Sequence, residues 1–182
     1  ATGLLGVAVQ SHWFSVGTAV TWAEPGVGAV ATQSFVEPAY GPRGLSLMKS
    51  GLAAPDALRA LLNVDPGRDV RQVAFVDTAG RVATHTGAKC IRCAGQHVGN
   101  GFSVQANMML NDDVVPAMAR AYESATGSLA DRLMAALEAA QAAGGDIRGR
   151  QSAAMLIVKG TASGRPWADR VLEMRVEDHP EP

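Results

Sequence analysis

The sequence predicts an α+β fold in which two β-sheets pack face to face and carry helices on their outer sides. The predicted strands come in clusters separated by pairs of helices, and this order favours α+β over regular βαβ alternation. Several predicted strands lack a clean alternation of apolar and polar residues, which indicates burial on both faces. With 182 residues, 47% of them hydrophobic, the chain suits one domain with a sizeable core.

In the first half of the chain, turn signals separate short apolar runs. The segments Glu24-Pro25-Gly26 and Thr78-Ala79-Gly80 have the composition of tight turns, and the second is expected to join a hairpin. Pro55 suits the first position of a helix, and Asp56 suits the positive end of its dipole. These signals predict strands over residues 5–11, 27–35, 71–77 and 81–86, and helices over residues 41–51 and 55–62.

The second half of the chain is expected to begin and end with strands around two longer helices. Asn111 is the predicted cap of a helix that runs to about residue 124. Ser128 and Asp131 have the spacing of a capping arrangement for a second helix, over residues 129–143, which Gly144-Gly145 would end. The remaining predicted strands cover residues 101–107, 152–159 and 170–177.

Charge and composition exclude several classes of partner. The formal net charge is -1 and only 18% of residues are charged, so no basic patch is available for a nucleic-acid backbone. No apolar run approaches the roughly 20 residues that cross a bilayer. Two cysteines are too few for a secreted disulfide framework. We therefore expect a cytoplasmic protein with a small-molecule ligand, no cofactor, and no nucleic-acid or membrane partner.

Both ends of the sequence resemble interior segments. Ala1-Thr2-Gly3 reads as a turn that runs directly into a strand, and a turn of this kind normally follows another element. The closing segment His179-Pro180-Glu181-Pro182 stops where a further element would begin. We expect residues 1–182 to form a single domain that lacks an N-terminal strand and a C-terminal segment.

Short strings along the whole chain resemble a bacterial and archaeal family known only as domain of unknown function 1028. The strings occur in the family's order, and they include Gly6–Ser11, Gly26–Gln33, Tyr40–Gly44, Asp65–Arg68, Gly101–Gln105, Ala143–Asp146 and Asp178–Glu181. Members of this family resemble N-terminal nucleophile (Ntn) hydrolases, whose fold is a four-layer αββα sandwich of two antiparallel sheets with helices outside.

The resemblance also implies a reaction. Ntn hydrolases cleave amide bonds with a nucleophile that is the first residue of a mature strand and whose free α-amino group is the base. Similar family members begin with a short strand containing Thr and Ser, ahead of the turn that is here Ala1-Thr2-Gly3. Thr2 maps to that turn and follows Ala1, so it is a poor nucleophile candidate. The resemblance further implies homo-oligomers, since Ntn relatives often assemble.

Polar residues at strand ends are the first candidate binding groups. Gln10 and Ser11 end the first predicted strand, where the resemblance implies polar groups around the nucleophile. Gln33 and Ser34 end the second, and Gln33 is preferred because its amide both donates and accepts hydrogen bonds. The structural alternative is that these side chains only pair the strand ends with loops.

Tyr40, Arg43 and Cys90 are candidate ligand-binding residues of a second kind. Arg43 near a predicted helix start adds a cation to backbone N–H groups that bind anions, unless it only forms a surface ion pair. The spacing His85-x4-Cys90-x2-Cys93-x3-His97 has zinc-preferred residue types, but it is compressed into one segment. Cys90 as a nucleophile would need His85 or His97 as its base, and the sequence favours Cys90 as a small buried apolar residue instead. We therefore expect no metal.

Three residues are candidate catalytic groups. Asn107 can donate to an oxyanion, or it can form a turn before Asn111. Asp146 and Ser152 belong to the densest polar cluster, together with the candidate ligand-binding residues Arg148 and Gln151. An Asp–Arg pair beside hydroxyl and amide groups can hold a small polar substrate, or it can be an ion pair that fixes a loop.

Two functions are compatible with these patterns. In the first, the protein is an amidohydrolase that acts on a small polar amide, with a nucleophile supplied by a residue N-terminal to Ala1. In the second, it is a non-catalytic module that binds a small ligand or serves in assembly. The first rests on analogy of fold, which supports a chemistry only weakly.

Overall fold

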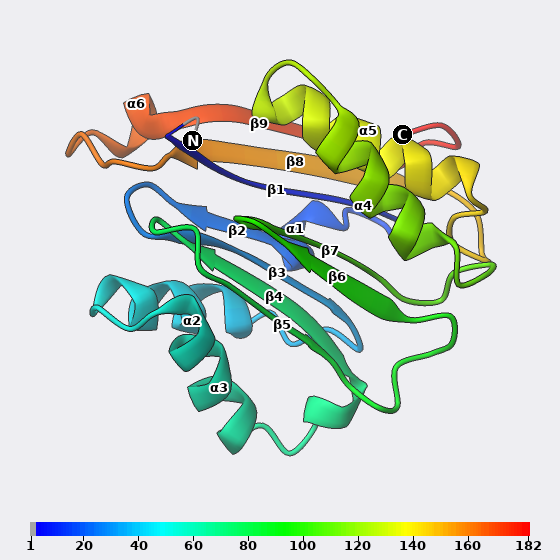
Figure 1. Ribbon diagram of the computed structural model, residues 1–182, viewed down its shortest axis with the longest axis horizontal. Helices are drawn as coiled ribbons and strands as arrows, with labels where there is room; N and C mark the ends of the chain where they lie inside the picture. Colours follow the sequence, from blue (N-terminus) through cyan, green and yellow to red (C-terminus); the bar gives the residue numbers. More distant parts are fainter. Residues whose placement is uncertain (1–2) are drawn as a thin grey trace.

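The computed structural model describes residues 3–182, which form three antiparallel sheets and the helices that cover them (Figure 1). The three-stranded sheet has the order β1 (Leu4–Ser11), β8 (Ser152–Lys159) and β9 (Arg170–Val176). The four-stranded sheet has the order β2 (Thr21–Glu24), β3 (Gly28–Ser34), β4 (Arg71–Asp77) and β5 (Val82–Thr86). A two-stranded ribbon consists of β6 (Gly95–Gly99) and β7 (Phe102–Ala106). The α+β class is therefore confirmed.

The helices fall into two pairs on opposite sides of the sheets (Figure 1). Helices α2 (Tyr40–Lys49) and α3 (Ala54–Val64) pack on the four-stranded sheet, where Phe75 and Val30 are buried against Leu45 and Leu58. Helices α4 (Val114–Ser124) and α5 (Leu129–Ala142) pack on each other, on the ribbon and on β1. The short helices are α1 (Gly17–Val20), α6 (Pro166–Asp169) and a 3-10 turn over Arg68–Val70.

Alternation along β1 explains how the layers stack. Leu5 and Val7 point toward the four-stranded sheet and pack against Ala29 of β3. Gly6 lies on the other face, where a Cβ atom would come 3.0 Å from Leu129 of α5. Because β1 has a small residue on one face and branched residues on the other, it contacts a helix and a second sheet at once.

Several sequence-based boundaries are confirmed and three details are wrong. Strands β4 and β8 have the predicted ends, and the predicted capping box joins Ser128 to Asp131 at the start of α5. The α4 helix begins at Val114 rather than after Asn111, whose side-chain oxygen accepts from the backbone N–H of Asp113 and whose side-chain nitrogen donates to the carbonyl of Ala143. Strands β2 and β6 had no expected counterpart, and there are three sheets rather than two among residues 3–182.

Asp77 joins the β4–β5 hairpin to the start of α3. One of its carboxylate oxygens accepts hydrogen bonds from the backbone N–H of Ala54 at 3.0 Å and from Nε of Arg81 at 2.8 Å. The other oxygen accepts the backbone N–H groups of Ala79 and Arg81. Burial alone would raise the pKa of Asp77, but these hydrogen bonds outweigh it and lower the pKa below its ordinary value.

We predict that Asp77→Asn lowers the free energy of unfolding by about 2 kcal/mol near neutral pH, because a charged acceptor and several of its hydrogen bonds are lost. A carboxyl whose pKa is lowered on folding stabilises above its unfolded pKa of about 3.9 and loses this effect as the pH falls through the folded value. The difference between variant and wild type should therefore shrink in acid. Urea unfolding at neutral and acidic pH measures it, with the exposed Asp56→Asn as a control expected to change stability by less than about 1 kcal/mol.

Candidate functional site

A cavity of about 610 Å³ opens where β1, β3 and β7 end. The strands end at the same place because β1 and β3 belong to stacked sheets and β7 lies beside β4, to which β3 is paired. Part of the wall is apolar and comes from Val9, Val20, Met118, Leu137 and Ala140. The polar part contains carboxamide and hydroxyl side chains, namely Gln10, Ser11, Gln33, Ser34, Gln105 and Asn107.

Gln72 of β4 organises the polar side of this cavity although it is fully buried itself. Its side-chain oxygen accepts from Nε2 of Gln33 at 2.7 Å and from Nδ2 of Asn107 at 3.0 Å. Its side-chain nitrogen lies within hydrogen-bond distance of the carbonyl oxygens of Gly95 and Ala106, at 3.1 and 2.9 Å. One amide group therefore ties the ribbon to the four-stranded sheet and orients two cavity side chains.

Gln105 presents an unpartnered amide to the same space. Both polar atoms of its side chain are buried, and neither has a hydrogen-bond partner among residues 3–182. Buried amide groups in folded proteins are nearly always paired, because an unpaired one costs about 1–3 kcal/mol. Gln105 is therefore a residue of the cavity wall whose side-chain hydrogen-bonding groups are unused by residues 3–182.

Two cavity residues have strained backbone conformations. Ser34 has a φ of 70° and Met108 a φ of 59°, in the left-handed region that non-glycine residues seldom occupy. Such residues each cost of the order of 1–3 kcal/mol and cluster at binding and catalytic sites. Ser34 follows Gln33, and Met108 follows Asn107, so the strained positions come directly after the two amides that Gln72 orients.

Asp146 and Arg148 form a two-pronged ion pair on the cavity wall. Arg148 donates from Nε at 2.9 Å and from Nη2 at 2.6 Å to the two carboxylate oxygens of Asp146. Burial would raise the pKa of Asp146, but the hydrogen bonds from Arg148 outweigh it and lower the pKa. Arg148 also reaches Ser11 Oγ at 3.5 Å. The pair is therefore charged near neutral pH and places a cationic side chain beside Ser11.

Ser152 and Gln10 line the cavity but use their polar atoms elsewhere. The Ser152 hydroxyl donates to the carbonyl of Trp13 and accepts from the backbone N–H of Val16 at 3.1 Å, and the residue is fully buried. Gln10 donates to the carbonyl of Leu137 at 2.9 Å. Ser152 thus fixes the loop after β1 rather than offering a free hydroxyl, whereas Gln10 keeps its carbonyl oxygen and its second N–H for a ligand.

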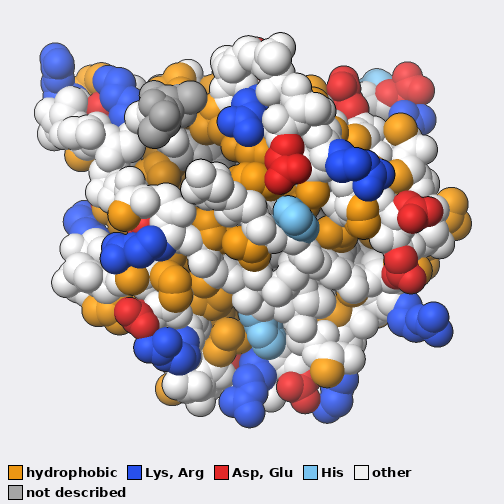
Figure 2. Space-filling model, in the orientation of Figure 1, with side chains coloured by type: hydrophobic (Ala, Val, Ile, Leu, Met, Phe, Trp, Pro, Cys, Tyr) orange, Lys and Arg blue, Asp and Glu red, His pale blue; other side chains and the backbone are white. Residues whose placement is uncertain are grey.

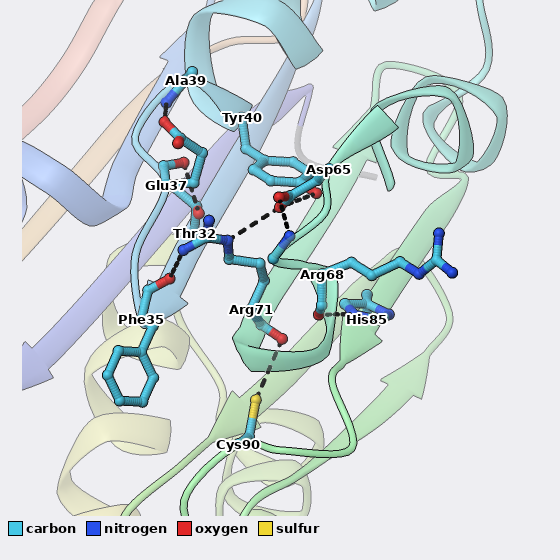
Figure 3. Close-up of polar contacts among 11 residues, drawn as sticks. Thr32, Phe35, Glu37, Ala39, Tyr40, Asp65, Arg68, Arg71, His85 and Cys90 are labelled. Atoms are coloured by element: carbon cyan, nitrogen blue, oxygen red, sulfur yellow. Dashed lines mark hydrogen bonds and ion pairs between the residues drawn. The ribbon is translucent and has the colours of Figure 1, made fainter. Parts of the chain in front are cut away.

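Tyr40 does not line the cavity, and its hydroxyl lies beside Asp65 and Arg71 instead (Figure 3). Its hydroxyl donates to Asp65 at 3.0 Å, and Arg71 donates to the same carboxylate oxygen at 3.0 Å and to the carbonyl of Phe35. Burial and the hydrogen bond to Asp65 raise the pKa of Tyr40, which therefore stays protonated. Arg71 and Phe35 both line the cavity, so this network holds the loop that follows Ser34.

Three other candidates lie outside the cavity wall. Arg43 is exposed on α2, and Gln151 donates to Asp178 at 3.1 Å. Cys90 donates through Sγ to the carbonyl of Arg71 at 3.3 Å (Figure 3). Within residues 3–182, no group of three or more His, Cys, Asp or Glu side chains has the geometry to hold a metal ion. Thr2 lies outside the described residues.

The sequence did not single out Gln72, Gln105, Arg71, Trp13 or Phe35 as site residues. Trp13 and Phe35 are large aromatic side chains at the cavity that remain 60% and 55% exposed, which is unusual for their size. Gln72 is the second residue of β4, ahead of the apolar residues 73–76. A polar residue next to an apolar run is the one sequence signal that could have identified Gln72 as a site residue. Gln105 carries no such signal, because Phe102–Ala106 alternates apolar and polar residues.

Charges of both signs are dispersed over the face shown in Figure 2. In the part of the chain that the structure describes, no helix is long and apolar enough to span a bilayer.

Comparisons with known proteins agree on one family. The family described as "Family of unknown function (DUF1028)" matches residues 1–182. The crystal structure of a DUF1028 protein from Silicibacter pomeroyi is similar to this structure, with a TM-score of 0.87 and 29% sequence identity. That similarity covers 98% of this chain and 75% of the Silicibacter pomeroyi chain. No curated protein matches the chain.

We predict that Gln72→Leu lowers the free energy of unfolding by about 3 kcal/mol, because it leaves buried amide and carbonyl groups without partners. Gln96→Leu on β6 replaces an exposed glutamine that accepts one hydrogen bond, from the Thr86 hydroxyl at 2.7 Å, and should change stability by less than about 1 kcal/mol. Denaturant unfolding of both variants measures the difference. Equal small effects would mean that the Gln72 amide does not hold the ribbon to the sheet.

Proposed function

The chain belongs to DUF1028, a family of unknown function, and we propose that its cavity binds a small polar amide and hydrolyses the amide bond. The observation that carries this proposal is the set of five carboxamide side chains around one partly apolar cavity, namely Gln10, Gln33, Gln105, Asn107 and Gln141. A carboxamide both donates and accepts hydrogen bonds, so it pairs with an amide ligand without requiring a charge on it.

The free hydrogen-bonding groups define where a substrate amide would lie. The side-chain oxygens of Gln33 and Asn107 accept no hydrogen bond from any described residue, and each nitrogen uses one of its two hydrogens on Gln72. Gln105 adds a complete unpartnered amide. Arg148, held by Asp146 and adjacent to Ser11, is positioned to receive a polar end of the ligand.

We interpret the face-to-face sheets with a helix pair on each outer side as the αββα arrangement of Ntn hydrolases. Within residues 3–182, β1 pairs only with β8 and β7 pairs only with β6, and both strands border the cavity. In this proposal the nucleophile is carried by a strand that pairs with the remaining edge of β1. Antiparallel pairing there would put the first residues of that strand near Ser11.

The proposed reaction has two steps. The hydroxyl or thiol of the nucleophile attacks the substrate carbonyl carbon, and its proton passes through the free α-amino group to the departing nitrogen as the carbon–nitrogen bond breaks. The second N–H of Asn107 stabilises the oxyanion. Water then cleaves the acyl-enzyme to release the acid and regenerate the nucleophile.

A non-catalytic binding protein is the second candidate, and the hydroxyl groups of the cavity favour it. The Ser152 hydroxyl is occupied by two backbone groups, and Ser11 is contacted by a guanidinium rather than by a base. Among residues 3–182, no hydroxyl or thiol on the cavity wall is hydrogen bonded to a His, Asp or Glu side chain that would activate it. The same cavity would then retain an amide ligand unchanged.

We expect the native protein purified from its source to begin with Thr, Ser or Cys and to be labelled there by an amide-directed electrophile. Intact-mass analysis identifies the first residue, and peptide mapping locates the adduct. A first residue without a nucleophilic side chain, or a protein that binds amides but never releases acid and amine, would favour the binding function instead.

We also predict that Asn107→Ala lowers kcat for amide hydrolysis by about 100-fold to 1000-fold, as expected for loss of an oxyanion donor. The matched control is Gln151→Ala, which removes a carboxamide outside the cavity and should leave kcat unchanged. Steady-state kinetics on a panel of small amides measures both. If Asn107→Ala changes KM alone, Asn107 binds the substrate without stabilising the transition state.

A further inference from the structure

The outer strand of the three-stranded sheet has an unprotected edge on the opposite side of that sheet from β1 (Figure 1). Within residues 3–182, β9 pairs only with β8. Glu173, Met174, Arg175 and Val176 are exposed, and Met174 has 57% of its surface in contact with solvent. Long exposed edge strands readily pair with other strands, so natural proteins usually protect them.

The regular part of β9 has one apolar and one charged face. Leu172, Met174 and Val176 share a face, since their β8 partners are Ile157, Met155 and Ala153. Glu173 and Arg175 lie on the other face. A bulge at Ile157 and Val158 of β8 interrupts the pairing near the N-terminal end of β9. Only residues 172–176 of β9 therefore form a regular strand edge.

We propose that β9 pairs antiparallel with β9 of a second copy of this chain, around a two-fold axis at Met174. In this register Met174 faces Met174 of the second copy, and Leu172 faces Val176 on the apolar side. Glu173 faces Arg175 on the charged side, and the symmetry produces this ion pair twice. The two three-stranded sheets then form one continuous six-stranded sheet.

Charge complementarity selects this register over its neighbours. If the apolar faces of the two β9 strands lie on the same side of the joined sheet, the two-fold axis must pass through a residue. The alternative registers therefore move the axis along the strand one whole residue at a time. An axis at Glu173 puts two carboxylates opposite each other, and an axis at Arg175 does the same with two guanidinium groups. Like charges directly opposite each other are destabilising, whereas opposite charges and matched apolar pairs stabilise a sheet. Only the axis at Met174 matches both faces of residues 172–176.

The existing contacts of the charged residues do not prevent this pairing. At the surface of the single chain, Glu173 pairs with Arg170, and Arg175 pairs with Glu177 and donates to the Ser15 hydroxyl at 3.2 Å. Surface ion pairs of this kind contribute little and are readily exchanged for new ones. Since five residues a side bury a small area, the dimer should dissociate on dilution in the micromolar range, as weak interfaces do. No β9 residue lines the cavity, so dimerisation is independent of the proposed function.

Charge reversal gives the first test. Sedimentation velocity of the full chain should show a concentration-dependent dimer, which Glu173→Arg or Arg175→Glu weakens at least tenfold by placing like charges opposite each other. The double variant Glu173→Arg/Arg175→Glu restores both ion pairs and should recover the dimer. Thermal unfolding of each variant separates weaker pairing from poor folding. A wild-type chain that remains monomeric at its highest soluble concentration, or a double variant that is not rescued, would overturn the proposal.

Cysteine cross-linking gives the second test. Met174→Cys places two thiols directly opposite each other, where Cα atoms about 4.5–5.5 Å apart suit a disulfide. Mild oxidation should therefore yield a disulfide-linked dimer, located at residue 174 by peptide mapping so that Cys90 and Cys93 are not confused with it. The control is Val171→Cys, exposed on the same strand but far from its counterpart in this register. Equal cross-linking of both variants, or none of Met174→Cys, would contradict the two-fold axis.

Discussion

The buried amide of Gln72 is the interaction on which both fold and site depend. A fully buried carboxamide must find partners for its nitrogen and its oxygen. Here the nitrogen fastens the β6–β7 ribbon over the four-stranded sheet, and the oxygen gathers Gln33 and Asn107 from two different layers. The same group that sets the position of the ribbon therefore sets the shape of the polar cavity wall, and neither can change alone.

Local signals in the sequence predicted most of the fold. The capping box at Ser128, the Thr78–Gly80 turn and the apolar run of β8 each act over a few residues, so each is legible without knowing the tertiary structure. Strand β6 was not predicted, because Gly95–Gly99 is short and polar and becomes a strand only by pairing with β7. Asn111 was assigned to a helix start by type, whereas its side chain forms a turn with Asp113 before the helix and also bonds to Ala143, 32 residues away.

The site was predictable to a smaller degree, and for a physical reason. Polar residues at strand ends suggested Gln10, Ser11, Gln33, Ser34 and Asn107, and the structure brings these side chains to one cavity together with Asp146 and Arg148. Tyr40, Arg43, Cys90 and Gln151 do not line it. The pattern marks a polar side chain but not the direction in which it points, so the supporting role of Tyr40 and the occupied hydroxyl of Ser152 depended on long-range contacts.

The left-handed backbone of Ser34 and Met108 has a thermodynamic consequence for recognition. Both residues directly follow strand-end amides that Gln72 holds, so the cavity mouth is shaped before any ligand arrives. A preformed mouth loses little chain entropy on association, and this saving favours selectivity by shape over adaptation to many ligands.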